Sequence, residues 1–173
     1  MTSPIPQDQV GPLVGRGDAS VRVLPGIGVI GEDVTEFPGH QVTPEQITML
    51  HTRYHLAVRL ADGKDVLELA CGSGVGLGCL AHRARRVVGG DLNPQAIEFA
   101  ARHYGPRVEV REVDAQNLPF ADAAFDVIVF LDSIYWLPQP RKFVDEAKRV
   151  LRPGGVIFIS TWSPMNVTPL SKP

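Results

Sequence analysis

The sequence predicts an α/β domain: a doubly wound parallel sheet with strand order 3-2-1-4-5 and a helical N-terminal cap. From Asp65 onward, short β-rich runs alternate with helical stretches, which is typical of a parallel sheet covered by helices on both faces. A glycine-rich turn comes after the first of these runs, and an acidic residue, Asp91, ends the second. In doubly wound folds these two positions form a ligand site at the ends of neighbouring strands.

The order of the elements is predicted by hydrophobic periodicity and capping signals. Thr43-Pro44-Glu45-Gln46 forms a capping box with proline at the first helical position, and apolar residues then recur at helical spacing. We expect an irregular arm at 1–42, a cap or lid helix at 43–63, a core at 64–162 and a Pro-rich tail at 163–173. The expected strands are 66–69, 87–90, 108–113, 125–131 and 156–161, and the expected core helices are 74–83, 94–103 and 141–151.

Composition excludes several classes of function. The chain has 173 residues with 17 Lys+Arg and 19 Asp+Glu, a net charge of −2 without a long basic cluster, so no nucleic-acid partner is expected. The longest apolar runs, 127–131 and 156–159, fall far short of the roughly 20 residues that span a membrane. Cys71 and Cys79 form neither a disulfide framework nor a Cys-x-x-Cys metal site. We therefore expect a cytoplasmic protein without a metal.

The strongest functional signal is the turn after the first strand. Gly72 and Gly74 permit positive φ and leave room for a ligand to approach the backbone, and a helix N-terminus with free N–H groups comes next. Asp91, at the end of the second strand, lies where this fold binds ribose hydroxyls. Together these features indicate a ligand of nucleoside size.

The details of the turn separate two such ligands, NAD and S-adenosylmethionine. In the dinucleotide fingerprint Gly-x-Gly-x-x-Gly, the third glycine falls on Leu77 when counted from Gly72 and on Cys79 when counted from Gly74. Counting from Gly76 fits an allowed variant but starts inside the expected helix. Glu68 would repel a pyrophosphate, whereas it suits a cationic ligand such as S-adenosylmethionine.

The segment Glu68-x-Ala70-x-Gly72-x-Gly74 resembles the first motif of class I S-adenosylmethionine-dependent methyltransferases, with Ala70 in place of the usual glycine. The resemblance extends over 64–161 and includes the fourth strand at 125–130 and the turn at 150–155. Within this class, the chain most resembles small-molecule or sugar methyltransferases of bacterial biosynthetic clusters, through the motif His51-x-x-Tyr54 and the segment 63–66 that enters the first strand. The resemblance implies S-adenosylmethionine as cofactor, bound by Glu68, Ala70, Gly72, Gly74, the ribose-binding acid Asp91, its neighbour Leu92, and the adenine-binding pair Asp114 and Ala115.

The expected C-terminal part differs from the family pattern. In the family the sheet continues after the fifth strand with a helix and an antiparallel strand pair, which we expect to be absent here. The strand at 156–160 would then be an apolar sheet edge, and such an edge favours pairing with another strand. We expect it to be covered by residues 21–30, by a second copy of the chain in a homodimer, or by sequence beyond Pro173.

Other motifs have simpler explanations. The segment 26–31 fits Gly-x-Gly-x-x-Gly, but Pro38 comes too soon after it for a long helix to form, so we interpret it as a decoy. His51 and His55 have a spacing that can hold a metal, but without a third ligand they are more typical of a surface or lid helix. Cys71 is expected to be a packing residue and Asp126 a structural hydrogen-bond partner. Asp132 lies just past the fourth strand, where α/β sheets bind ligands, so we include it among the cofactor-binding residues.

The predicted function is methyl transfer from S-adenosylmethionine to an oxygen or nitrogen of a small-molecule acceptor, such as a sugar or natural product. A hydroxyl acceptor would require a general base. The candidates by position are His40, His51, His55, Asp132 and Tyr135. Two alternatives stay open: an NAD(P)-linked oxidoreductase, and a non-catalytic module that binds S-adenosylmethionine.

Overall fold

The predicted fold class and strand order are confirmed. The computed structural model describes residues 44–161, which form a five-stranded sheet in the order β3-β2-β1-β4-β5, with every neighbouring pair parallel. The predicted arm at 1–42, with the segment 26–31 and His40, and the predicted tail at 163–173 lie outside the described residues. No helix in the described part of the chain combines the length and apolar character needed to cross a bilayer.

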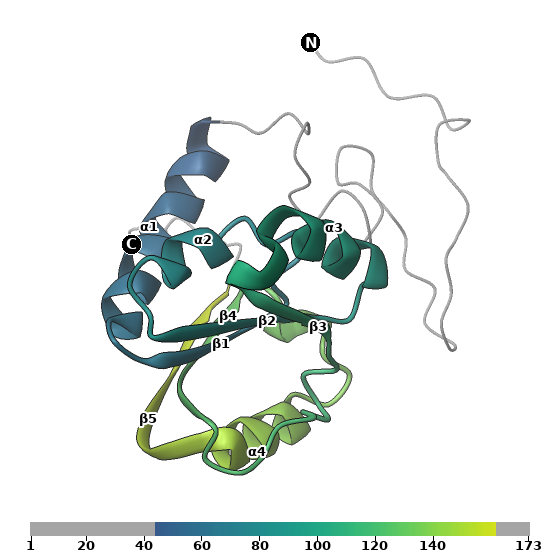
Figure 1. The fold of residues 1–173 in the computed structure, drawn as a ribbon. Helices are drawn as coiled ribbons and strands as arrows, with labels where there is room; N and C mark the ends of the chain where they lie inside the picture. Colours follow the sequence, from purple (N-terminus) through teal and green to yellow (C-terminus); the bar gives the residue numbers. More distant parts are fainter. Residues whose placement is uncertain (1–43, 162–173) are drawn as a thin grey trace, which may run out of the picture.

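Helices cover both faces of the sheet. In Figure 1, α1, α2 and α3 lie on one face and α4 lies on the other. Short 3-10 turns come after α3 and β4. The strands are β1 (Asp65–Leu69), β2 (Arg86–Asp91), β3 (Glu109–Glu112), β4 (Phe125–Leu131) and β5 (Leu151–Ser160); the helices are α1 (Pro44–Ala61), α2 (Leu77–Ala81), α3 (Pro94–Tyr104) and α4 (Pro140–Val150).

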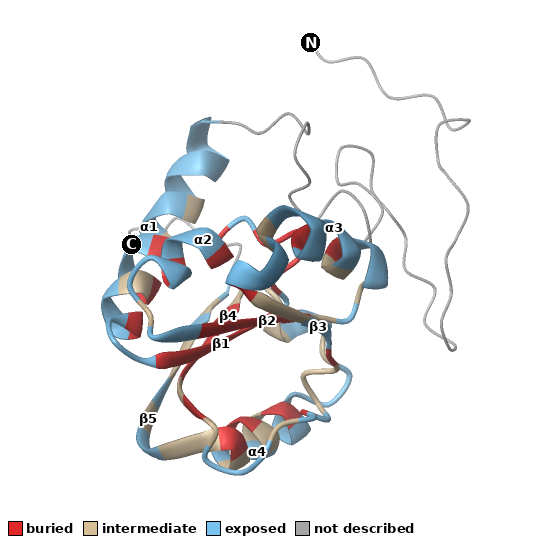
Figure 2. Cartoon of the chain, viewed as in Figure 1, coloured by how far each residue is buried: buried red, intermediate tan, exposed pale blue. Residues whose placement is uncertain are grey.

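The central strand β1 is buried on both faces. Its residue Leu67 pairs with Val88 of β2 on one side and with Ile128 of β4 on the other. All five residues of β1 are buried, and Figure 2 shows buried residues concentrated along the inner strands and the sheet-facing side of α4. A strand buried in this way holds the turn at its carboxyl end in a fixed position.

Helix α1 belongs to the core. Its residues Tyr54, Ala57 and Ala61 are buried and pack with β1 and β4 residues in the cluster on that face of the sheet. The predicted helix at 43–63 is therefore confirmed as a helix, here Pro44–Ala61, although its action as a lid stays a prediction. Because α1 packs directly on the sheet, its side chains have defined positions relative to the strand ends.

Two elements begin three or more residues away from their predicted starts. The helix after the glycine turn begins at Leu77 and not at Gly74, because Gly74 has a φ of +85°, which a right-handed helix cannot contain. Strand β5 begins at Leu151 and not at residue 156. Leu151 pairs with Phe125 before an irregularity, and regular pairing resumes where Val127 pairs with Val156.

An ion-pair network closes the other end of the sheet. The backbone N–H of Asp65 donates to Asp126 at 2.9 Å, and Arg152 contacts both carboxylates at 2.9 and 3.0 Å. The hydrogen bond from Arg85 lowers the pKa of Asp65, and the backbone N–H of Asp65 lowers the pKa of Asp126. Asp126 is thus the structural partner that the sequence predicted.

Candidate functional site

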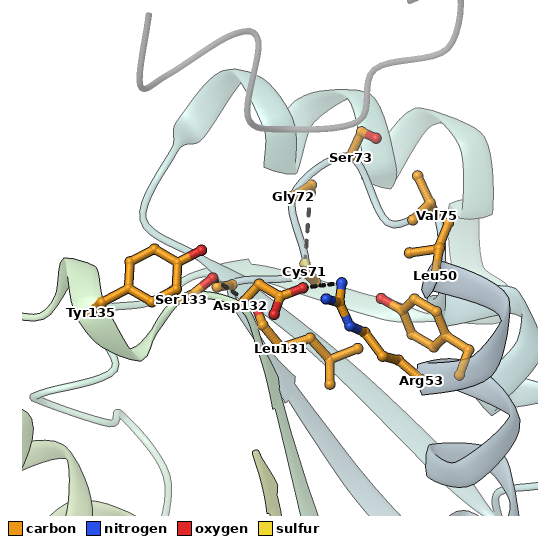
Figure 3. A pocket seen from close by; sticks show the side chains of 12 residues that line it. Leu50, Arg53, Cys71, Gly72, Ser73, Val75, Leu131, Asp132, Ser133 and Tyr135 are labelled. Atoms are coloured by element: carbon orange, nitrogen blue, oxygen red, sulfur yellow. Dashed lines mark hydrogen bonds and ion pairs between the residues drawn. The ribbon is translucent and has the colours of Figure 1, made fainter. Parts of the chain in front are cut away.

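A cavity of about 210 Å³ opens at the carboxyl ends of β1 and β4. In Figure 3, Gly72 and Ser73 of the glycine turn lie above it, and Arg53 and Tyr135 lie on opposite sides. Ligands bind in doubly wound folds at this end of the strands. Its lining residues come from α1, from the turn after β1 and from the segment after β4: Leu50, Arg53, Tyr54, Ala70, Cys71, Gly72, Ser73, Val75, Leu131, Asp132, Ser133 and Tyr135.

The turn after β1 contains three residues with positive φ. Gly72 has a φ of +54° and Gly74 a φ of +85°, so both require the freedom that the sequence attributed to them. Ala70 also has a φ of +54°. A left-handed conformation strains an alanine by roughly 1 kcal/mol, which explains physically why the family pattern has glycine there.

Tyr104 at the end of α3 fixes the middle of this turn. Its hydroxyl donates to the carbonyl of Gly74 at 2.6 Å and accepts the N–H of Gly78 at 3.0 Å. A Cβ at Gly74 would lie 2.9 Å from the Tyr104 ring. No sequence motif identified Tyr104, because its partners are backbone atoms 26 and 30 positions away.

Gly76 is required for a different reason. Its φ of −94° and ψ of −19° are ordinary helical values that any residue adopts. However, a Cβ at this position would overlap the aromatic ring of Tyr54. The close contact between α1 and the glycine turn therefore depends on the absence of a side chain at Gly76.

Glu68 is a buried carboxylate beneath the turn. The hydroxyl of Tyr54 donates to its Oε1 in a short hydrogen bond, while its Oε2 is buried without a hydrogen-bond partner. The pKa of Glu68 is raised to about 7: burial is the main cause, the Tyr54 hydrogen bond lowers the pKa in opposition, and the charge of Asp91 adds to the rise. Burial also raises the pKa of the Cys71 thiol, consistent with the packing role predicted for Cys71.

Asp91 organises the turn from the neighbouring strand. One carboxylate oxygen accepts the N–H of Gly72 and the other accepts the N–H of Asn93, both at 2.8 Å. Each oxygen keeps a second acceptor position for another donor. The next residue, Leu92, which was also predicted to bind the cofactor, has an exposed fraction of 60%.

The predicted adenine pair Asp114 and Ala115 comes after β3, outside the lining of the cavity. Asp114 accepts the N–H of Gln116 at 2.8 Å, so its carboxylate is held by its own turn. The preceding residue, Val113, donates its N–H to the carbonyl of Asp91 at 2.8 Å. The pair Asp114 and Ala115 therefore comes directly after a residue that is hydrogen-bonded to Asp91, the residue that holds the glycine turn.

Asp132 comes directly after β4 and has a left-handed conformation, with a φ of +49°. Its side chain forms an ion pair with Arg53 of α1 and accepts the hydroxyl of Ser160 at 3.2 Å, as Figure 3 shows for the ion pair. Tyr135 lines the same cavity, and burial followed by the charge of Asp132 raises its pKa. Sequence reasoning missed Arg53, because only the packing of α1 brings it to the end of β4.

The two histidines of α1 lie elsewhere. His51 and His55 are exposed, their rings stack with centroids 6.3 Å apart, and neither lines the cavity. Of the predicted general-base candidates within the described residues, the structure brings only Asp132 and Tyr135 to it. Across 44–161 we find no cluster of three or more His, Cys, Asp or Glu side chains that could hold a metal ion.

Comparison with known proteins identifies the family. A family model described as a methyltransferase domain matches residues 67–159, more than half of the chain. The chain belongs to this methyltransferase domain family. The sequence resemblance to class I S-adenosylmethionine-dependent methyltransferases is thereby confirmed, and S-adenosylmethionine is the cofactor of the family.

Two curated relatives are similar to this methyltransferase domain. A protein of Mycolicibacterium smegmatis named "probable S-adenosylmethionine-dependent methyltransferase" is 38% identical over 165 residues, covering 92% of this chain and 57% of that protein. A Mycobacterium ulcerans protein named "probable phthiotriol/phenolphthiotriol dimycocerosates methyltransferase 2" is 40% identical over 111 residues, covering 59% and 42% respectively. The chain thus spans about half the length of these relatives.

A solved structure shows the same fold. The PH0226 protein of Pyrococcus horikoshii OT3 superposes with a TM-score of 0.62 at 30% identity, covering 72% of this chain and 62% of that one. The family finding favours the methyltransferase prediction over the NAD(P)-linked alternative.

Proposed function

We propose that this chain binds S-adenosylmethionine in the described cavity and transfers its methyl group to an oxygen or nitrogen of a small-molecule acceptor. The observation that carries the proposal is the buried carboxylate of Glu68, with one oxygen unpartnered, directly before the strained glycine turn. A buried acid without a cationic partner is destabilising. The ammonium group of an amino-acid ligand would supply that partner.

The charges around the cavity fit this cofactor better than a dinucleotide. Glu68 and Asp91 lie beside the turn, and the single arginine among the lining residues, Arg53, is already paired with Asp132. A pyrophosphate would meet these carboxylates without a free cation to offset them. The remaining acceptor positions of Asp91 suit ribose hydroxyls, as does its place at the end of β2.

The bound cofactor supplies a methyl group on a sulfonium centre, which is already an excellent leaving group. The residues therefore have to align the acceptor atom and exclude water. In the proposed site, Glu68 would hold the ammonium group of the cofactor and Asp91 its ribose hydroxyls, while Leu92, Asp114 and Ala115 would lie around the adenine. Ala70, Gly72 and Gly74 provide the backbone against which it lies.

For the acceptor we propose an apolar molecule with a hydroxyl group. The apolar walls of the cavity are formed by Leu50, Val75, Leu131 and Tyr135, and the M. ulcerans relative is named as a phthiotriol/phenolphthiotriol dimycocerosates methyltransferase. Asp132 lies just past β4 within this cavity and is the best-placed residue to accept the hydroxyl proton, with Tyr135 beside it. This placement narrows the general-base candidates and leaves His51 and His55 without support.

The test is equilibrium binding and then turnover. We expect calorimetry of the full chain to show binding of S-adenosylmethionine and S-adenosylhomocysteine but not of NADH, and labelled methyl transfer to a panel of long-chain alcohols and amines. Gly72→Val should abolish binding, whereas Gly105→Val is a matched control with the same φ of +54° and open space around it. Binding of NADH in preference to S-adenosylmethionine would contradict the proposal, and cofactor binding without turnover would favour the non-catalytic alternative.

A further inference from the structure

Tyr54 touches three parts of the candidate site at once. It is buried on α1, lines the cavity, and donates its hydroxyl to Oε1 of Glu68. Its ring occupies the space that Gly76 leaves free at the start of α2.

The hydroxyl is the only hydrogen-bond donor that the described residues provide to the Glu68 carboxylate, since Oε2 has no partner. Such a bond favours the ionised form of a buried acid and fixes its rotamer. Without it, burial and the neighbouring Asp91 would act on Glu68 unopposed. The state of Glu68 thus depends on whether α1 is docked.

We infer that Tyr54 is a positioning residue for the cofactor: its hydroxyl orients the Glu68 carboxylate toward the cofactor's ammonium group and favours the ionised form of that carboxylate, so that docking of α1 and cofactor binding are coupled. The inference rests on the proposed function, because it takes S-adenosylmethionine as the ligand. It goes beyond the proposed function because it assigns a direct electrostatic role in cofactor binding to α1, through the hydroxyl group of Tyr54.

Other titratable groups near Glu68 set the background for this effect. Asp91, at the end of β2, raises the pKa of Glu68 through its charge. The charge of Glu68 in turn contributes to raising the pKa of Cys71 in the turn and of Tyr104 on α3. The Arg53 and Asp132 pair lies across the same cavity. Removal of the Tyr54 hydroxyl leaves all of these groups in place.

The test compares two probes that differ in the amino-acid group. S-adenosylhomocysteine carries the ammonium, and 5′-methylthioadenosine lacks it. In Tyr54→Phe, which keeps the ring against Gly76, we expect affinity for S-adenosylhomocysteine at pH 7 to fall about tenfold, the size expected for a charged hydrogen bond. Affinity for 5′-methylthioadenosine should change little. The acid limb of the plot of affinity against pH should move to higher pH.

Two further variants keep the inference falsifiable. Tyr104→Phe is a matched control, because it also removes a tyrosine hydroxyl from the glycine turn; it should weaken both probes equally and leave the pH limb in place. In a Glu68→Gln background, Tyr54→Phe should have little additional effect on probe selectivity, since Tyr54 acts through Glu68.

Equal losses for the two probes in Tyr54→Phe, an unmoved pH limb, or additive effects in the double variant would overturn the inference. Circular dichroism and thermal unfolding of each variant show whether it is folded before binding is compared. If the unmodified chain binds neither S-adenosylmethionine nor S-adenosylhomocysteine, the proposed function itself fails. The two failures are therefore distinguishable.

Discussion

Gly76→Ala is expected to destabilise the protein although the backbone at Gly76 is compatible with alanine. With a φ of −94° and a ψ of −19°, the position carries no conformational penalty for a side chain. The new methyl group would overlap the Tyr54 ring, so the ring must move. Overpacking of this kind costs about 1–3 kcal/mol, and loss of the hydrogen bond to Glu68 adds ~1 kcal/mol or more.

We therefore expect the free energy of unfolding to fall by about 2–4 kcal/mol in Gly76→Ala, a large part of the stability of a typical domain. Urea denaturation monitored by circular dichroism measures this, and cofactor affinity should fall with it because α1 is displaced. Gly78→Ala is the control: it lies in α2, and its Cβ would come no closer than 3.3 Å to the Tyr104 hydroxyl. That contact is tight, so the Tyr104 hydroxyl must shift by a few tenths of an ångström, and Gly78→Ala should cost far less stability than Gly76→Ala. Equal destabilisation by both substitutions would refute the steric argument.

Four other expectations concern the cofactor site, the buried acid, the α4 network and the sheet edge. Asp91→Ala should weaken S-adenosylmethionine binding about tenfold or more in calorimetry, because the carboxylate holds Gly72 as well as the proposed ribose; an unchanged dissociation constant would remove Asp91 from the site. Glu68 holds its proton more tightly in the folded state, with a pKa of about 7 against the ordinary 4.5, so stability should fall as pH rises between these values, by roughly 3 kcal/mol. Glu68→Gln should lack this fall in urea titrations at pH 5 and pH 8, and parallel curves would contradict the assignment. Arg149→Met should lower stability by about 2 kcal/mol without altering cofactor affinity, since Arg149 binds Glu146, Asp122 and the carbonyls of Leu118 and Phe120 far from the cavity lining. Finally, Val156 and Ile159 on the edge strand β5 have exposed fractions of 42% and 37%, and we predict that this edge is covered, with a second copy in a homodimer as one candidate. Light scattering measures whether the chain is a monomer, and hydrogen exchange measures the protection of the amides at 156–160. Rapid exchange of these amides in a stable monomer would show that the edge is open.

The sequence was sufficient for the parallel sheet because each strand is a local apolar run and the connections leave few topologies. The glycine turn and Asp91 were equally accessible, since both sit at fixed offsets from strand ends. By contrast, the start of α2 was placed at Gly74 because the sequence does not show which glycine adopts positive φ. The start of β5 was missed because Pro153 and Gly154 are typical of a turn, so the sequence does not indicate that Leu151 already pairs with Phe125.

The contacts of α1 were the least predictable part of the site. Periodicity identified a helix with an apolar face, and Tyr54 was one residue on that face. Its hydrogen bond to Glu68 and the ion pair of Arg53 with Asp132 depend on how the helix is rotated and placed over the sheet. Those quantities arise from packing against several strands at once, which no local pattern encodes.

These contacts explain how a cap helix becomes part of a cofactor site. Glu68 and Asp132 lie at or just beyond the carboxyl ends of the adjacent strands β1 and β4, and two consecutive residues of α1, Arg53 and Tyr54, bind one acid each. Consecutive residues on a helix point about 100° apart, so Arg53 and Tyr54 diverge and can reach two different acids. Arg53 neutralises the acid on the proposed acceptor side, whereas Tyr54 orients the other without neutralising it. When Glu68 is ionised, its negative charge has no cationic partner among the described residues, and a ligand that carries its own cation beside a nucleoside is the kind that this arrangement favours.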